Sequence, residues 1–125
     1  MPIAYWCILI AAIMPIAIVS FAKAGSSGNN HDPRAGIDDL PGQQRRGYFA
    51  HLNAYENFPF FAIAVIVATT MGAPIHIVDA LAVIYIVLRI AHALLYIGDI
   101  PTARSSVFLV AYLVNIAIFV LPAFK

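Results

Sequence analysis

Apolar residues occur in four long runs along the chain, separated by polar segments. The runs cover residues 2–22, 48–71, 75–97 and 103–122. A helix of about 20 residues rises about 30 Å, which matches the hydrocarbon thickness of a bilayer. The pattern therefore predicts an all-α integral membrane protein, a four-transmembrane-helix bundle in which residues 1–125 form a single domain.

The longest polar segment, residues 23–44, separates the first two runs. It is rich in Gly, Ser, Asn and Pro, a composition typical of irregular chain. Turns are expected at Asp32-Pro33 and at Leu40-Pro41, because the residue before a proline avoids helical geometry. Little chain remains outside the runs, so any chemistry must come from helix faces and short loops.

Composition narrows the class further. Hydrophobic residues make up 62% of the chain and charged residues only 10%, whereas soluble domains have about a quarter charged residues. Lipid is therefore an expected partner. The net charge of +1 provides no general attraction for nucleic acid, so none is expected. The single cysteine excludes an intramolecular disulfide.

Basic residues are distributed asymmetrically between the polar segments. The turn between the second and third runs has none, whereas segment 23–44, its flanks and the link before the fourth run hold Lys23, Arg34, Arg45, Arg46 and Arg104. The positive-inside rule predicts that these two segments are cytoplasmic and that both termini are not.

The second run carries polar residues into the apolar region. If it is helical, Arg46, Asn53 and Glu56 follow one stripe together with Phe60. A carboxylate at mid-bilayer costs roughly 2.5–3.5 kcal/mol on an insertion scale. Such a residue indicates a functional site unless it merely pairs with another charge.

The third run carries a second stripe. Tyr85, Arg89, His92 and Tyr96 are spaced i, i+4, i+7 and i+11, which places them on one helix face. Arg89 cannot lose its charge within the membrane. We therefore expect Arg89 to pair with Glu56.

The start of the fourth run carries Arg104 and Ser105. If Thr102 is the N-cap, Arg104 lies in the first helical turn, where the helix dipole disfavours a cation. A bound anion would explain this placement. The alternative is a cytoplasmic charge that only fixes topology.

The predicted topology brings these polar groups to one membrane level. Arg89 and Arg104 could hold carboxylates and Glu56 an ammonium group, which suits a small anionic zwitterion. Tyr96 or Arg104 could donate a hydrogen bond to a thiolate or an oxyanion. No metal site is expected, because His51, His92 and Glu56 lack the spacing of helical zinc ligands.

Three segments carry a resemblance to a known family. Residues 50–60 read AHLNAYENFPF and contain the pattern A-H-x-N-x-x-E-x-x-P, and residues 89–96 read RIAHALLY, followed by Arg104-Ser105. The chain thus resembles the MAPEG family, the membrane-associated proteins in eicosanoid and glutathione metabolism. The turn at residues 32–34 is similar to the bacterial branch, which implies a bacterial inner-membrane location.

The resemblance implies a fold, an assembly and an activity. It implies a left-handed four-helix bundle assembled as a homotrimer, with glutathione bound between subunits near the cytosolic face. The activity would be conjugation or reduction of lipophilic electrophiles with glutathione as co-substrate, with Arg104 and Ser105 activating the thiol. The glutathione contacts that it implies are Arg46, Asn53, Glu56, His92, Tyr96 and Arg104, to which the stripe on the third run adds Arg89.

Two other functions remain open from the residues. Family enzymes have Arg before the Ala-His pair, where this chain has Phe49; that difference favours a non-catalytic membrane scaffold in which Glu56 and Arg89 only fix packing. A small multidrug-type transporter also has four spans and one membrane carboxylate. However, its glutamate lies in the first span, which is uncharged here, and its loops are short.

Overall fold

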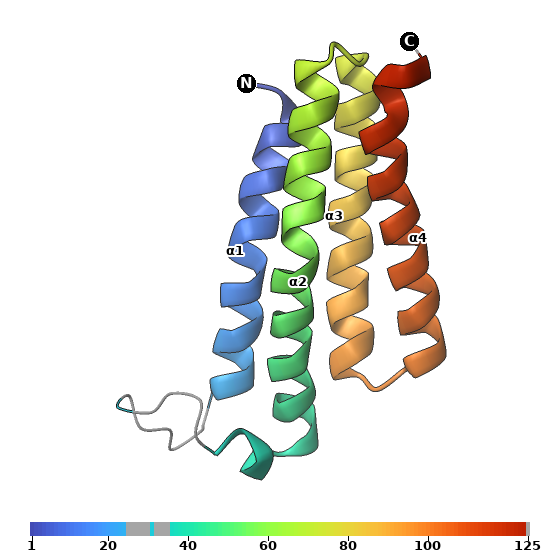
Figure 1. The fold of residues 1–125 in the computed structure, drawn as a ribbon. Coiled ribbons are helices and arrows are strands. Elements are labelled where there is room, and N and C mark those ends of the chain that lie inside the picture. Colours follow the sequence, from blue (N-terminus) through green and yellow to red (C-terminus); the bar gives the residue numbers. More distant parts are fainter. Residues whose placement is uncertain (25–30, 32–35, 125) are drawn as a thin grey trace.

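The chain folds into antiparallel helices that lie side by side (Figure 1). The computed structural model describes residues 1–24, 31 and 36–124, so the turn expected at Asp32-Pro33 lies outside the described residues. The described elements are helical: α1 (Ile3–Lys23), η1 (Ile37–Asp39), α2 (Gly42–Thr70), α3 (Ile75–Ile97), α4 (Pro101–Val120) and η2 (Leu121–Phe124).

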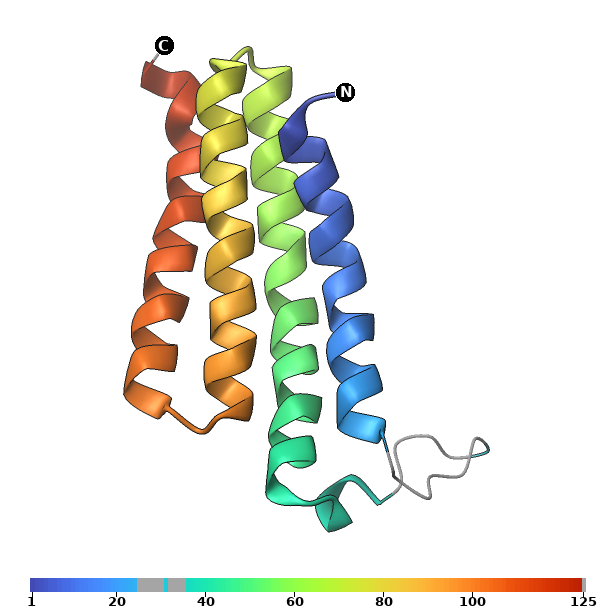
Figure 2. The same cartoon turned by 180° about the vertical axis from the view of Figure 1, so that it is seen from behind.

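The four long helices run alternately up and down. The start of α1, the end of α4 and the α2–α3 turn lie at one end, whereas the end of α1, the start of α2 and the α3–α4 link lie at the other (Figure 2). Each of the four helical segments is long and apolar enough to cross a membrane. The protein is a multi-pass integral membrane protein, and the four spans expected from the hydrophobic pattern are confirmed.

Two helix starts differ from the sequence prediction. α2 begins at Gly42 rather than at residue 48, because Pro41 ends the extended chain and its carbonyl accepts the first helical hydrogen bond, from Arg45 N–H at 2.9 Å. α4 begins at Pro101, with Ile100 as its N-cap. The prediction of Thr102 as N-cap was wrong, since proline at the first helical position is already set in helical geometry.

Small residues line the contacts between helices. Ala4, Ala64, Ala68 and Ala82 are completely buried, which lets neighbouring backbones approach closely as membrane helices do. Long apolar side chains instead point outward, where lipid or another protein surface would cover them. Examples are Ile13, Ile66, Val87 and Leu113.

A carboxylate from α3 caps the start of α1. α1 has Pro2 at its N-cap and no side-chain cap of its own. The Ala4 N–H donates instead to Asp79 Oδ1 at 2.8 Å. A negative charge at a helix N-terminus is favourable because free amides and the helix dipole converge there. This contact joins α1 to α3 at the end of the bundle that carries the termini.

α2 and α3 both end in Schellman motifs, but with different residues at the left-handed position. In α2, Gly72 has φ of 79°, and Ala73 N–H donates to Ala68 O at 2.9 Å. In α3, Asp99 takes that position with φ of 59°, and Ile100 N–H donates to Leu95 O at 3.0 Å. Glycine adopts this conformation without the strain that a Cβ introduces.

We predict that Asp99→Gly stabilises the protein. Relief of the left-handed strain should exceed the entropy that glycine loses on folding, raising the free energy of unfolding by about 0.5 kcal/mol. The matched variant Gly72→Ala introduces the opposite change and should lower it by about 1–2 kcal/mol. Unfolding of both variants in detergent micelles checks this, and destabilisation by Asp99→Gly would contradict it.

Candidate functional site

The polar stripes of α2 and α3 meet inside the bundle. Arg89 is only 4% exposed, and its Nη2 donates to Asn53 Oδ1 at 2.6 Å. The expected Glu56–Arg89 ion pair is not formed; among the described residues the only ion pair joins Arg45 to Asp38 at 3.5 Å. Glu56 is exposed, because three residues after Asn53 a side chain points about 60° away around the helix.

A further polar network lies beside this contact. The Tyr85 hydroxyl donates to the Asn57 carbonyl at 3.4 Å, and Asn57 Nδ2 donates to the Asn53 carbonyl at 2.8 Å. Asn115 of α4 is 2% exposed, and its Oδ1 has no hydrogen-bond partner among the described residues. Sequence reasoning missed Asn57, although its place one helical turn after Asn53 is the available signal. The hydrogen bonds of this network join α2 to α3 beside Arg89.

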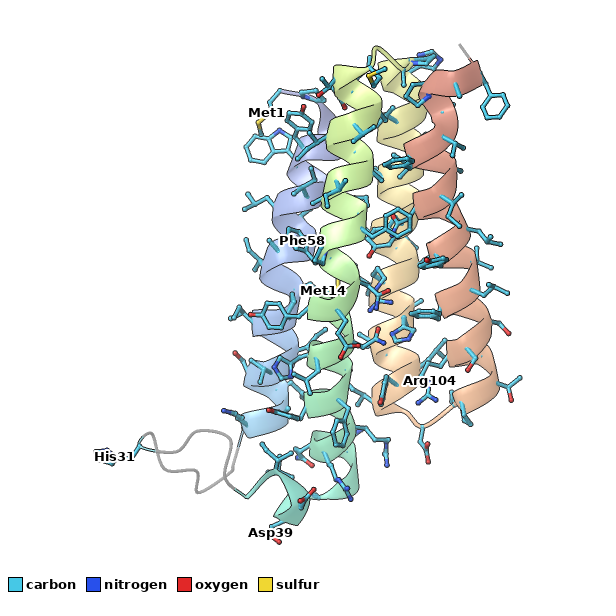
Figure 3. The ribbon with its side chains drawn as sticks, in the orientation of Figure 1. Met1, Met14, His31, Asp39, Phe58 and Arg104 are labelled. Atoms are coloured by element: carbon cyan, nitrogen blue, oxygen red, sulfur yellow. The ribbon has the colours of Figure 1, made fainter. Side chains whose placement is uncertain are left out.

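A pocket opens next to this network, between α2, α3 and α4. Its volume is about 270 Å³. It lies toward the end of the bundle that carries the α3–α4 link, where Figure 3 labels Arg104. Its lining residues are Asn53, His92, Tyr96, Arg104, Ser105 and Phe108.

Arg104 is held against an aromatic face in the pocket wall. Its Cζ lies 4.5 Å from the centroid of the Tyr96 ring, a distance at which a guanidinium is attracted by the ring quadrupole. Its own N–H donates to Ile100 O at 3.0 Å, so Arg104 lies in the first turn of α4 as expected. The stacking fixes where the cation points without neutralising its charge.

His92 is the most enclosed polar residue of the pocket wall. Its side chain is 3% exposed, and its ring lies 6.0 Å from that of Tyr96 and 5.9 Å from that of Phe108. Its Nδ1 has no hydrogen-bond partner among the described residues. A buried polar atom without a partner is costly, so it favours a ligand or a water in the pocket.

The lining residues carry one positive charge and several hydrogen-bonding groups, with no carboxylate among them. Because nothing in this wall repels a negative group, the arrangement suits an anion or a group that becomes anionic. The sequence did not predict Phe108 as a pocket residue, because it lies in a run of apolar residues and resembles its neighbours. Its signal is the spacing of four residues from Arg104, which places both on one face of α4.

Three of the expected site residues do not line the pocket. Arg46 Nε donates to Ile97 O at 3.0 Å, at the C-terminal end of α3, where a cation complements the helix dipole. Arg89 donates a hydrogen bond to Asn53, which lines the pocket, but does not line the pocket itself. Glu56 is exposed on the outer face of α2. Of the expected site residues, the structure thus brings five together in the pocket wall: Asn53, His92, Tyr96, Arg104 and Ser105. Arg46, Glu56 and Arg89 lie outside it.

Two other residues of the α2 motif lie outside the pocket. The His51 ring packs against Tyr48 and Tyr55, with centroids 4.7 Å and 5.8 Å away, and its Nδ1 contacts the Tyr48 carbonyl. Phe49 is at the surface, with Arg45 Cζ 5.7 Å from its ring centroid. In the described part of the chain no three His, Cys, Asp or Glu residues are grouped as metal ligands.

The fold and this arrangement of residues agree with a comparison of the sequence with known families. The MAPEG family model matches residues 3–124. The chain therefore belongs to the MAPEG family, and it is a multi-pass membrane protein of that glutathione and eicosanoid metabolism family. No curated protein and no solved structure matches the chain.

We predict that Asn53 and Arg89 are energetically coupled. Asn53→Leu should lower the free energy of unfolding by about 1.5–3 kcal/mol, because it removes a hydrogen bond to a buried charge. Arg89→Leu removes that charge, so the double variant should recover part of the loss. Unfolding of the single and double variants in micelles measures the coupling, and purely additive losses would contradict it.

Proposed function

We propose that this protein is a glutathione-dependent membrane enzyme. In this proposal it joins glutathione through its sulfur to lipophilic electrophiles from the bilayer, or uses glutathione to reduce them. Residues 1–125 act as one catalytic domain. The observation that carries it is the pocket, in which a cation and hydrogen-bonding side chains of α2, α3 and α4 meet without a carboxylate.

The proposed chemistry rests on Arg104 and Ser105 at the start of α4. A thiolate beside them would accept a charge-assisted hydrogen bond from Arg104 and a second from Ser105 or Tyr96. Such bonds are worth roughly 1.5–3 kcal/mol when one partner is charged. Since one pKa unit corresponds to about 1.4 kcal/mol, each of them would lower the pKa of a bound thiol by about one to two units.

The remaining proposed contacts require a second copy of the chain. Glu56 is exposed on a membrane-spanning helix, and a carboxylate facing lipid is expensive. Cover by a neighbouring subunit would remove that cost, which supports a homotrimer with glutathione between subunits. In that assembly Asn53, His92 and Tyr96 contact glutathione from the pocket wall, and Arg46 and Glu56 bind its charged ends. Arg89, which is buried, positions the Asn53 side chain for its contact with glutathione.

The proposed orientation follows the distribution of basic residues. Arg45, Arg46 and Arg104 lie at the end of the bundle that carries the start of α2 and the α3–α4 link. We infer that this end faces the cytoplasm of a bacterial inner membrane, with both termini on the other side. The pocket would then open where cytosolic glutathione meets substrates dissolved in lipid.

We predict that glutathione binds the detergent-purified protein and becomes a thiolate at neutral pH. Arg104→Leu should remove the thiolate absorbance and weaken binding at least ten-fold, because one charge-assisted hydrogen bond is worth about that factor. Calorimetric titration and ultraviolet difference spectra measure both effects. The matched control is Arg45→Leu, which removes a cation from the same end of the bundle but outside the pocket.

The same titration separates this proposal from the scaffold alternative. A wild-type protein that binds no glutathione at millimolar concentration would refute the enzyme, and the scaffold function would replace it. Loss of binding in both arginine variants would show that overall charge, rather than the position of Arg104, attracts glutathione.

Labelling of introduced cysteines tests the orientation. In a Cys7→Ala background, Asp38→Cys and His76→Cys place thiols at exposed positions on opposite ends of the bundle. A membrane-impermeant maleimide should label the thiol at position 76 in spheroplasts and the thiol at position 38 only after permeabilisation. The reverse pattern would place the pocket end outside the cytoplasm.

A further inference from the structure

The last carbonyls of α3 are satisfied in two different ways. The carbonyls of residues 94–96 accept backbone hydrogen bonds from the amides of residues 98–100, at 2.9–3.2 Å. The next carbonyl, that of Ile97, has no such helical donor, because Pro101 lacks an N–H. It accepts a hydrogen bond from a different helix instead, from Arg46 Nε of α2 at 3.0 Å.

We propose that Arg46 is a positioning residue for the pocket. Its Nε completes the C-terminal cap of α3 and thereby holds the Tyr96–Arg104 pair in place against α2. The inference rests on the proposed function and deepens it, because it assigns what sets the geometry on which thiolate formation depends. It concerns Nε alone, since Nη1 and Nη2 of the same guanidinium are not used by this contact and can bind a charged end of glutathione.

The constraint reaches the pocket through a short stretch of chain. Tyr96, whose ring centroid lies 4.5 Å from Arg104 Cζ, is the residue before Ile97. The Arg104 N–H donates to Ile100 O at 3.0 Å, so the first turn of α4 is built on the end of the α3–α4 link. Movement of Ile97 relative to α2 would therefore change how this pair faces Asn53, the α2 residue in the same pocket wall.

The α3–α4 link benefits from support by a neighbouring helix because its own geometry is strained. Asp99 has a positive φ of 59°, a conformation that costs free energy for a residue with a Cβ. Residues 98–100 are all exposed, so side-chain packing does little to stabilise their turn. Arg46 is partly buried and ties the residue just before this turn to α2.

Two substitutions of Arg46 separate its hydrogen bond from its charge. The amide Nε2 of glutamine is as many bonds from Cα as the Nε of arginine, so Arg46→Gln keeps a donor for Ile97 O but removes the cation. Arg46→Leu removes both. Arg45→Leu is the positional control, because Arg45 is the preceding residue and pairs with Asp38 instead.

Hydrogen exchange of the glutathione-free protein in micelles measures the cap directly. In Arg46→Leu the amides of residues 99–104 should exchange about five-fold faster than in wild type, the change expected for the loss of one hydrogen bond. Their exchange in Arg46→Gln and Arg45→Leu should stay within about two-fold of wild type. The Ala73 N–H, which donates to Ala68 O at 2.9 Å in the α2–α3 turn, is the internal reference and should not change.

The pKa of the bound thiol shows whether the cap positions Arg104. At saturating glutathione, the pH midpoint of the thiolate absorbance should rise by about 0.5–1 unit in Arg46→Leu, because the hydrogen bond from Arg104 to the thiolate would be weakened. Arg46→Gln should keep the wild-type midpoint but bind glutathione more weakly, since the charge is absent and the cap is not. A side chain that only stabilised the fold would not separate these two effects.

The two measurements distinguish failure of the cap from failure of the proposed function. Unchanged exchange in Arg46→Leu, or equal midpoint shifts in the leucine and glutamine variants, would overturn the positioning role while leaving the glutathione proposal intact. Faster exchange of residues 99–104 in Arg46→Leu, but not in Arg46→Gln or Arg45→Leu, supports the cap even if glutathione does not bind. In that case only the proposed function fails.

Discussion

The bundle depends on one buried cation. Arg89 lies inside a membrane-spanning helix, cannot lose its charge, and is held by the Asn53 side chain at 2.6 Å. A charge at this depth is tolerated only when it faces protein and has a hydrogen-bonding partner. The contact therefore fixes how α2 and α3 are rotated and aligned against each other, and the hydrogen bonds of Tyr85 and Asn57 support that alignment.

The position of the pocket follows from this alignment. Once Asn53 faces Arg89, the residues one to two turns further along α3, His92 and Tyr96, face α4 at the same level as Arg104. The pocket thus lies beside the Asn53–Arg89 contact, where residues of α2, α3 and α4 meet. Arg104 then needs only the face of Tyr96 to be oriented, and its charge remains available to a ligand.

Much of this could be predicted from the sequence, because hydrophobic length and helical spacing are properties of single helices. The four spans, the shared face of Tyr85, Arg89 and His92, and the first-turn position of Arg104 all follow from such local rules. The partner of Arg89 could not be predicted in this way, since Asn53 and Glu56 lie on neighbouring parts of the same helix. Only the packing of α2 on α3 determines which of them faces the guanidinium.

The differences at two helix starts, in contrast, have local causes. α2 starts early because of Pro41, which is its N-cap. α4 starts early because Pro101 has a fixed φ that suits the first helical position, so the helix begins before Thr102. Phe108 belongs to the pocket wall but cannot be distinguished from lipid-facing residues by hydrophobicity alone. Its role becomes visible only when the neighbours of α4 are known.

The hydrogen bond from Ala4 to Asp79 also has a consequence for biosynthesis. The two residues are 75 positions apart in the chain, so α1 leaves the ribosome long before its capping carboxylate has been synthesised. α1 and α2 can pair in the membrane as soon as both have been inserted. The amide end of α1, however, acquires its partner only when α3 arrives, so α1 is fully fixed in place only after two later helices have been synthesised.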